Sequence, residues 1–88
     1  MKNKDKITDD VLCAEYSAVY RYVLSLCRDE SLASDITQET FLKAMSAKKG
    51  FEGQSSLYTW LCSIAKRLWL NKVKKQSREV RDEDLFTD

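Results

Sequence analysis

The sequence of 88 residues contains no histidine and no proline, only two glycines and three cysteines. Without histidine, the side chain most used for proton transfer near neutral pH and for zinc binding is missing. Two glycines are too few for a glycine-rich phosphate loop. Cys13, Cys27 and Cys62 are far apart and form no CxxC pair, which favours reduced thiols over a disulfide or a metal site. We therefore expect neither an enzyme nor a bound cofactor or metal.

Long apolar runs are also missing. No stretch approaches the roughly 18 apolar residues that cross a membrane. The N-terminus, Met-Lys-Asn-Lys-Asp-Lys, is charged but lacks the apolar stretch of a secretory signal. The sequence thus predicts a cytoplasmic protein without membrane insertion. Its length suits one small domain, whose stability should be modest without a partner.

The net charge of +1 conceals a gradient along the chain. Residues 1–49 carry eight basic and eight acidic side chains. Residues 50–78 carry six basic side chains against Glu52 alone, and residues 79–88 have a net charge of −4. A basic segment of this kind is a weak indication of nucleic-acid binding.

Periodic apolar positions predict three helices and no strand. Thr8 can cap the first helix, which extends to Cys27, and Asp29 or Ser31 can cap the second, which runs to about Lys49. Gly50 suits the left-handed position that closes a helix. Ser55 or Ser56 can cap the third helix, which runs to about Gln76. The apolar positions of the first helix recur at steps of three and four: Leu12, Tyr16, Val19, Tyr20, Val23, Leu26 and Cys27.

The third helix is apolar over much of its circumference, so we expect it to be central and to pack against both others. Residues 77–88 are charged and lack periodicity, which favours a frayed end or a flexible linker. The predicted fold is all-α, a three-helix bundle-like domain over residues 1–76, with the charged C-terminal tail at 77–88 as the start of a linker.

The predicted second helix has two faces. Its inward face collects small and apolar residues, namely Ala33, Ile36, Thr37, Thr40, Phe41 and Ala44. Its outward face carries Asp35, Gln38, Glu39 and Leu42. Polar residues are ordinary on a solvated helix surface, whereas Leu42 among them hints at a contact surface.

The segment from Phe51 to Ser56 is predicted to be a turn with a serine cap. Small, hydroxyl, amide and aromatic side chains there could also hold an unstacked base. On the third helix Thr59, Ser63, Lys66, Arg67 and Lys74 lie opposite the apolar face, while Trp60 belongs with the core. No acidic residue occurs between Glu52 and Glu79, so neighbours along the helix do not neutralise this basic stripe.

Two runs together, Asp35 to Ala44 and Ser55 to Arg67, resemble region 2 of a bacterial sigma factor of the extracytoplasmic-function group. The resemblance extends over roughly Ala14 to Ser77. It implies a module that recognises and melts promoter DNA during transcription initiation, as part of RNA polymerase. It also implies an anti-sigma factor as a partner.

The same resemblance implies a role for each run. Asp35, Gln38, Glu39 and Leu42 would bind the clamp helices of the RNA polymerase β′ subunit, with Phe41 in the core. The non-template strand of the −10 element would bind the loop and the third helix, through Phe51, Gln54, Ser55, Ser56, Thr59, Ser63, Lys66, Arg67 and Lys74. The loop would hold an extruded base of that strand.

Two residues depart from the family pattern. Glu52 stands where arginine is frequent in the family, and Arg67 stands where asparagine is frequent. The −10 sequence that this chain would read therefore does not follow from the resemblance. The helix-turn-helix that reads the −35 element is absent, so we expect the chain to be part of a longer factor. Two alternatives stay open: a protein-interaction module with an acidic partner, and an independent helical DNA-binding domain. For the latter, the loop before the third helix is long.

Overall fold

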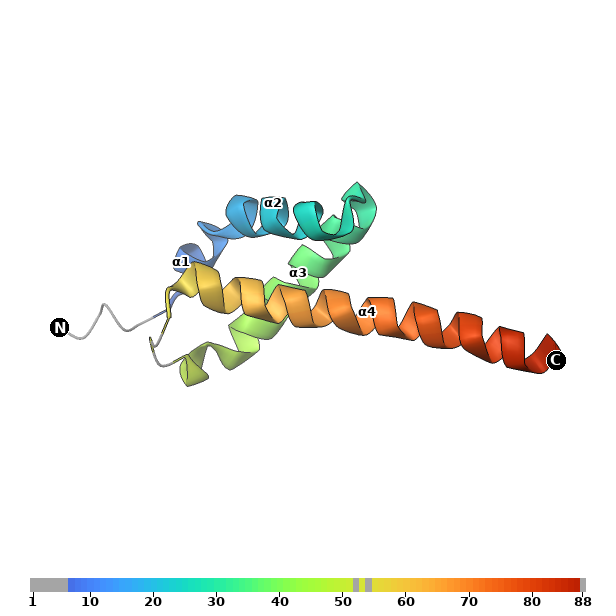
Figure 1. Cartoon of the computed structure of the whole chain (residues 1–88). Coiled ribbons are helices and arrows are strands. Elements are labelled where there is room, and N and C mark those ends of the chain that lie inside the picture. Colours follow the sequence, from blue (N-terminus) through green and yellow to red (C-terminus); the bar gives the residue numbers. More distant parts are fainter. Residues whose placement is uncertain (1–6, 52, 54, 88) are drawn as a thin grey trace.

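The computed structural model describes residues 7–51, 53 and 55–87, with side chains described as far as Gln76. Every regular element in these residues is helical, so the predicted all-α fold is confirmed (Figure 1). The elements are α1 (Asp9–Cys13), α2 (Tyr16–Cys27), α3 (Glu30–Ala47), the short 3₁₀ helix η2 (Lys48–Gly50) and α4 (Leu57–Thr87).

Side-chain caps begin three of the helices, as predicted. The Val11 N–H donates to Thr8 Oγ1 at 3.2 Å, and the Leu32 N–H donates to Asp29 Oδ1 at 3.0 Å. The Thr59 N–H donates to Ser56 Oγ at 3.0 Å. Each bond satisfies one of the donors that a helix start leaves unpaired. Asp29 rather than Ser31, and Ser56 rather than Ser55, are therefore the caps of α3 and α4.

The predicted first helix is interrupted. Ala14 and Glu15 form a turn between α1 and α2, in which the Glu15 N–H donates to the Leu12 carbonyl at 2.9 Å. This i to i−3 bond tightens the chain, so α1 and α2 point in different directions (Figure 1).

The prediction of a left-handed Gly50 was wrong. Gly50 ends η2, and the left-handed residues in the described part of the chain are Arg28, with φ 57° after α2, and Gly53, with φ 76° in the loop before α4. A 3₁₀ turn closes α3 without any positive φ. At Gly53 the positive φ favours glycine, because a residue with a Cβ rarely adopts this conformation.

The helix α4 is longer than expected and continues to Thr87 instead of ending near Gln76. Loss of apolar periodicity marks where packing ends, but it does not mark where helix propensity ends. No glycine or proline follows Gly53, and Lys75 and Glu79 have the spacing of a favourable pair one turn apart. The division of the chain at residue 76 stays a prediction.

The core lies where α2, α3 and α4 meet, and α4 contacts both other helices as predicted. All six residues of the inward face predicted for α3 are buried. The hydroxyls of Thr37 and Thr40 donate to the carbonyls of Ala33 and Ile36, both at 2.7 Å, which satisfies them inside the core. Leu12, Val19, Val23, Leu61, Cys62, Ala65 and Leu68 complete the core from the other helices.

Candidate functional site

The outward face of α3 presents the four predicted contact residues. Asp35 and Gln38 are exposed, and the Gln38 amide donates to Ser34 Oγ at 3.3 Å. Leu42 is 66% exposed, the largest exposure among the large hydrophobic residues described. Burial of Ile36, Thr37, Thr40 and Phe41 fixes the rotation of α3 and so turns this polar stripe outward.

Glu39 differs from the other three residues because it leans towards α4. Its Oε1 lies 3.7 Å from Lys72 Nζ, and the two side chains are 44% and 41% exposed, respectively. An exposed pair at this distance contributes little to stability. It does, however, place Glu39 at the boundary between the acidic stripe and the basic helix.

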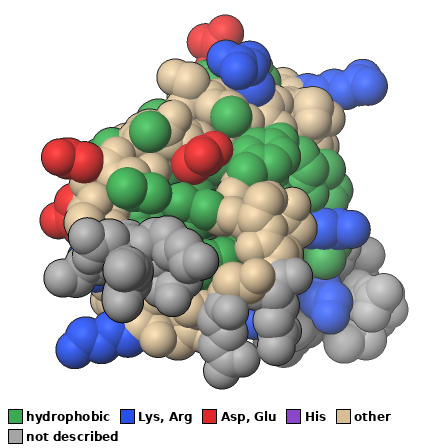
Figure 2. All heavy atoms as spheres, turned by 90° about the vertical axis from the view of Figure 1, so that its left-hand side faces the viewer, with side chains coloured by type: hydrophobic (Ala, Val, Ile, Leu, Met, Phe, Trp, Pro, Cys, Tyr) green, Lys and Arg blue, Asp and Glu red, His purple; other side chains and the backbone are tan. Residues whose placement is uncertain are grey.

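The loop before α4 brings two aromatic rings together. Phe51 and Trp60 are half-buried, with ring centroids 4.9 Å apart and a tilt of 43°. Trp60 also packs against the core cluster, in agreement with the prediction. Hydrophobic side chains gather on the end of the molecule near α1 and the start of α4 (Figure 2). Glu52 and Gln54 lie outside the described residues, so the predicted role of Gln54 stays a prediction.

The hydroxyl groups near the start of α4 already have partners within the chain. Ser55 Oγ donates to the Ser56 carbonyl at 3.2 Å, and Ser56 Oγ donates to Thr59 Oγ1 at 2.9 Å. Ser63 Oγ donates to the Trp60 carbonyl at 2.7 Å. All four hydroxyls are exposed, so they can still accept hydrogen bonds from a ligand.

The basic face of α4 is free to bind anions. Lys66, Arg67 and Lys74 are exposed, and the ion pairs found among the described side chains include none of them. The exposed cations and the hydroxyls of Thr59 and Ser63 lie on the solvent side of α4, as predicted.

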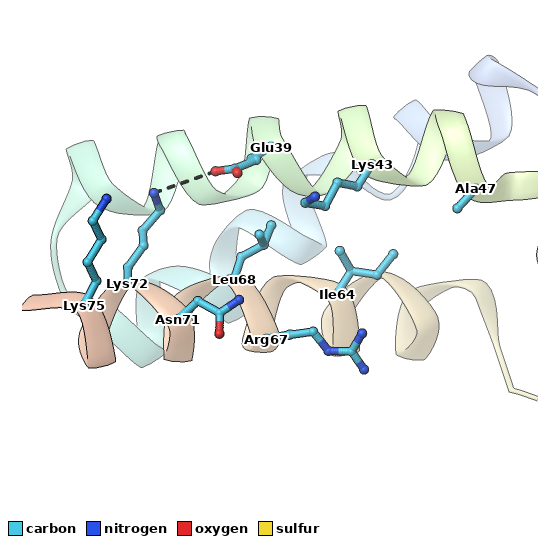
Figure 3. Close-up of a pocket in the computed structure, with 9 residues that line it drawn as sticks. All are labelled: Glu39, Lys43, Ala47, Ile64, Arg67, Leu68, Asn71, Lys72 and Lys75. Carbon is cyan, nitrogen blue, oxygen red and sulfur yellow. Dashed lines mark ion pairs between the residues drawn. The ribbon is translucent and has the colours of Figure 1, made fainter. Parts of the chain in front are cut away.

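A groove of about 520 Å³ runs between α3 and α4 (Figure 3). Lys43 on α3 and Arg67, Lys72 and Lys75 on α4 line it together with Glu39. Its apolar lining includes Ile64 and Leu68. The sequence patterns predict no role for Lys43, Lys72 or Lys75. On α4, the spacing of Leu68, Lys72 and Lys75 at steps of four and three could have indicated this shared face.

Cys62 is a buried thiol on α4, away from the groove. Burial raises the pKa of this thiol, an effect that a hydrogen bond with Tyr58 partly opposes. Over the part of the chain that the structure describes, no group of three or more histidine, cysteine or acidic residues could hold a metal ion. Nor is any described helix long and apolar enough to cross a membrane.

The model of the family described as "Sigma-70 region 2" matches residues 14–79. The chain therefore belongs to the sigma-70 region 2 family, as the paired motifs on α3 and α4 predicted.

Curated relatives place the chain near sigma factors of the extracytoplasmic-function group. It is 35% identical over 80 residues to the ECF RNA polymerase sigma factor EcfG of Rhodopseudomonas palustris, with 91% of this chain and 44% of the relative covered. It is 32% identical over 91 residues to the RNA polymerase sigma factor YlaC of Bacillus subtilis, with 99% and 52% covered. The chain thus spans about half the length of these relatives.

A solved structure has the same fold. The sigma factor RpoE of Bartonella quintana, in complex with the anti-sigma factor NepR, is similar with a TM-score of 0.75 and 32% sequence identity. The similarity covers 83% of this chain and 46% of that one.

Proposed function

We propose that this chain is the region 2 module of an RNA polymerase sigma factor and acts in transcription initiation. The separation of two charged faces on adjacent helices carries the proposal. The acidic and amide stripe of α3 docks on the clamp helices of the β′ subunit, and the basic face of α4 with its preceding loop holds the −10 element.

Docking uses Asp35, Gln38, Glu39 and Leu42. Carboxylate and amide groups pair with arginines of a partner helix through charge-assisted hydrogen bonds, and exposed Leu42 adds an apolar contact beside them. The charge pattern supplies specificity for a basic partner helix.

Strand binding uses two kinds of contact. Lys66, Arg67 and Lys74 neutralise phosphates and set the position of the strand, while the loop with Gln54, Ser55 and Ser56 accepts an extruded base. The paired aromatic rings of Phe51, in the loop, and Trp60, on α4, lie beside these residues and offer a surface on which a base can stack. Thr59 and Ser63 offer hydroxyl oxygens along the same path.

A ternary-complex measurement tests this assignment against its two alternatives. A fluorescein-labelled −10 non-template strand should bind tightly only when core polymerase and this chain are both present. An independent DNA-binding domain would bind duplex equally well without polymerase. A pure protein-interaction module would leave the binding of the strand to core polymerase unchanged.

An anti-sigma factor is the second partner that we propose. The solved relative was crystallised with one, and the neighbouring acidic and basic surfaces on α3 and α4 suit a partner that wraps both. An anti-sigma protein, if one is encoded beside this chain's gene, should bind the chain more tightly than it binds an unrelated helical domain, and should compete with the clamp helices. Equal binding to the two domains would refute this assignment.

A further inference from the structure

The groove between α3 and α4 is cationic around an apolar floor. Lys43, Arg67, Lys72 and Lys75 contribute four positive charges against Glu39 alone, and Ile64 and Leu68 form apolar lining between them. Both helices line the groove, and Figure 3 shows Lys72 and Lys75 extending from α4 towards α3, beside Glu39. An acidic helix with apolar residues on the same face would complement such a surface.

The chain carries such a helix at its own C-terminal end. Residues 79–88 have a net charge of −4 and include Leu85 and Phe86. The segment up to Thr87 belongs to α4, which is one continuous helix of 31 residues. Helical spacing puts Glu79, Asp82 and Phe86 in register with Leu68, Lys72 and Lys75, at steps of four, three and four after Lys75.

This stripe is complementary to itself when two copies of α4 lie antiparallel. With the two-fold axis at Ser77, Lys75 lies opposite Glu79 of the second copy, and Lys72 lies opposite Asp82. In the same register Leu68 lies opposite Phe86. Two-fold symmetry requires that each such contact occur twice. We propose that the groove binds the acidic C-terminal end of α4 from a second copy of the chain.

The same end cannot reach its own groove while α4 is straight. The helix carries residues 79–87 beyond Lys75 and away from the helical body, and the molecule is 63 Å long but only 24 by 17 Å across (Figure 1). Folding back would break α4 in a stretch without glycine or proline. Pairing with a second copy leaves the helix intact.

The dimer covers Glu39 and Arg67, one residue from each of the two surfaces assigned above. The proposal of a dimer is independent of the proposed sigma-factor function, because it follows from charge and spacing alone. Short helical contacts with exposed charges form weak and transient interfaces. Screening should therefore weaken the dimer at least about 10-fold between about 50 mM and about 500 mM salt.

Two charge-reversal variants of the 88-residue chain test the pairing by sedimentation velocity. Lys72→Glu with Lys75→Glu, and separately Glu79→Lys with Asp82→Lys, each place like charges opposite one another and should weaken self-association at least about 10-fold. An equimolar mixture of the two variants restores all four opposite pairs, so it should form a heterodimer. Circular dichroism checks that both variants keep their helix content.

A matched control reverses the same amount of charge on the other side of α4. Lys66→Glu with Lys74→Glu should leave self-association within about 3-fold of the original, because neither residue lines the groove. If the unmodified chain stays monomeric at low salt and high micromolar concentration, the proposal is refuted. The proposal is equally refuted if the groove variants dimerise as strongly as the unmodified chain, or if the two variants fail to associate when mixed.

Discussion

Removal of Lys66 and Arg67 should change how DNA binding depends on salt. Both side chains are exposed on α4, outside the ion pairs found among the described residues, so both are available to phosphates. Lys72, by contrast, already faces Glu39 at 3.7 Å. Each phosphate neutralised on a single strand contributes about 0.7 to the slope of log affinity against log salt. The variant Lys66→Ala, Arg67→Ala should therefore lose about 1.4 of that slope.

The loop should behave differently from the basic face. Replacement of Gln54 and Ser55 by alanine removes groups that we propose to hydrogen-bond a base, but removes no charge. We expect a weaker preference for one non-template base and a nearly unchanged salt slope, since base contacts specify and phosphate contacts position.

Fluorescence anisotropy separates the two effects. Labelled non-template oligonucleotides are titrated at several salt concentrations, alone and with reconstituted polymerase. Arg21→Gln with Arg28→Gln, which removes two exposed charges at α2, is the matched control and should keep the original slope. If both the Lys66 and Arg67 variant and the loop variant alter only the slope, the loop is not a base pocket. An unchanged slope without Lys66 and Arg67 would remove α4 from the DNA interface.

Three further predictions concern stability. Ser56→Ala removes the cap of α4 and should cost about 1 kcal/mol, which thermal unfolding would register as a fall in Tm of about 4–8 °C. Ile36→Ala should lower the free energy of unfolding by about 2–5 kcal/mol, because it leaves a cavity in the core. Thr37→Val should change it by no more than about 1 kcal/mol, because the Ala33 carbonyl keeps its backbone partner in the helix. Urea unfolding of both variants measures the difference. Folding raises the pKa of the Cys62 thiol. At a pH just above the ordinary thiol pKa, the thiol therefore ionises in the unfolded chain but stays protonated in the folded one. Stability should therefore fall there as pH rises, with a smaller fall in Cys62→Ala, and Cys62 should be alkylated more slowly than exposed Cys13.

The faces of the helices could be predicted from the sequence because packing imposes a period of 3.6 residues. That period predicts a buried position for Ala33, Ile36, Thr37 and Thr40, and the same rotation turns Asp35 outward, as the structure shows. Caps could be predicted because few residue types satisfy the free N–H groups at a helix start.

Features without a periodic signal could not be predicted. The turn at Ala14 and Glu15 depends on backbone hydrogen bonds that ordinary residue types can make. The extension of α4 to Thr87 reflects propensity without packing. The pairing of Glu39 with Lys72 depends on how α3 and α4 are rotated against each other, which a single helical pattern does not contain.

The binding of the β′ clamp helices tests the central proposal most directly. Calorimetric titration compares the unmodified chain with Asp35→Ala, Gln38→Ala, Glu39→Ala, and with Glu30→Ala as an exposed control on the same helix. We predict that the triple variant, still folded by circular dichroism, binds at least about 10-fold more weakly, since a polar interface contact typically contributes about 1–3 kcal/mol. The Glu30→Ala control should keep the original affinity. Unchanged affinity of the folded triple variant would contradict docking through the outward face of α3.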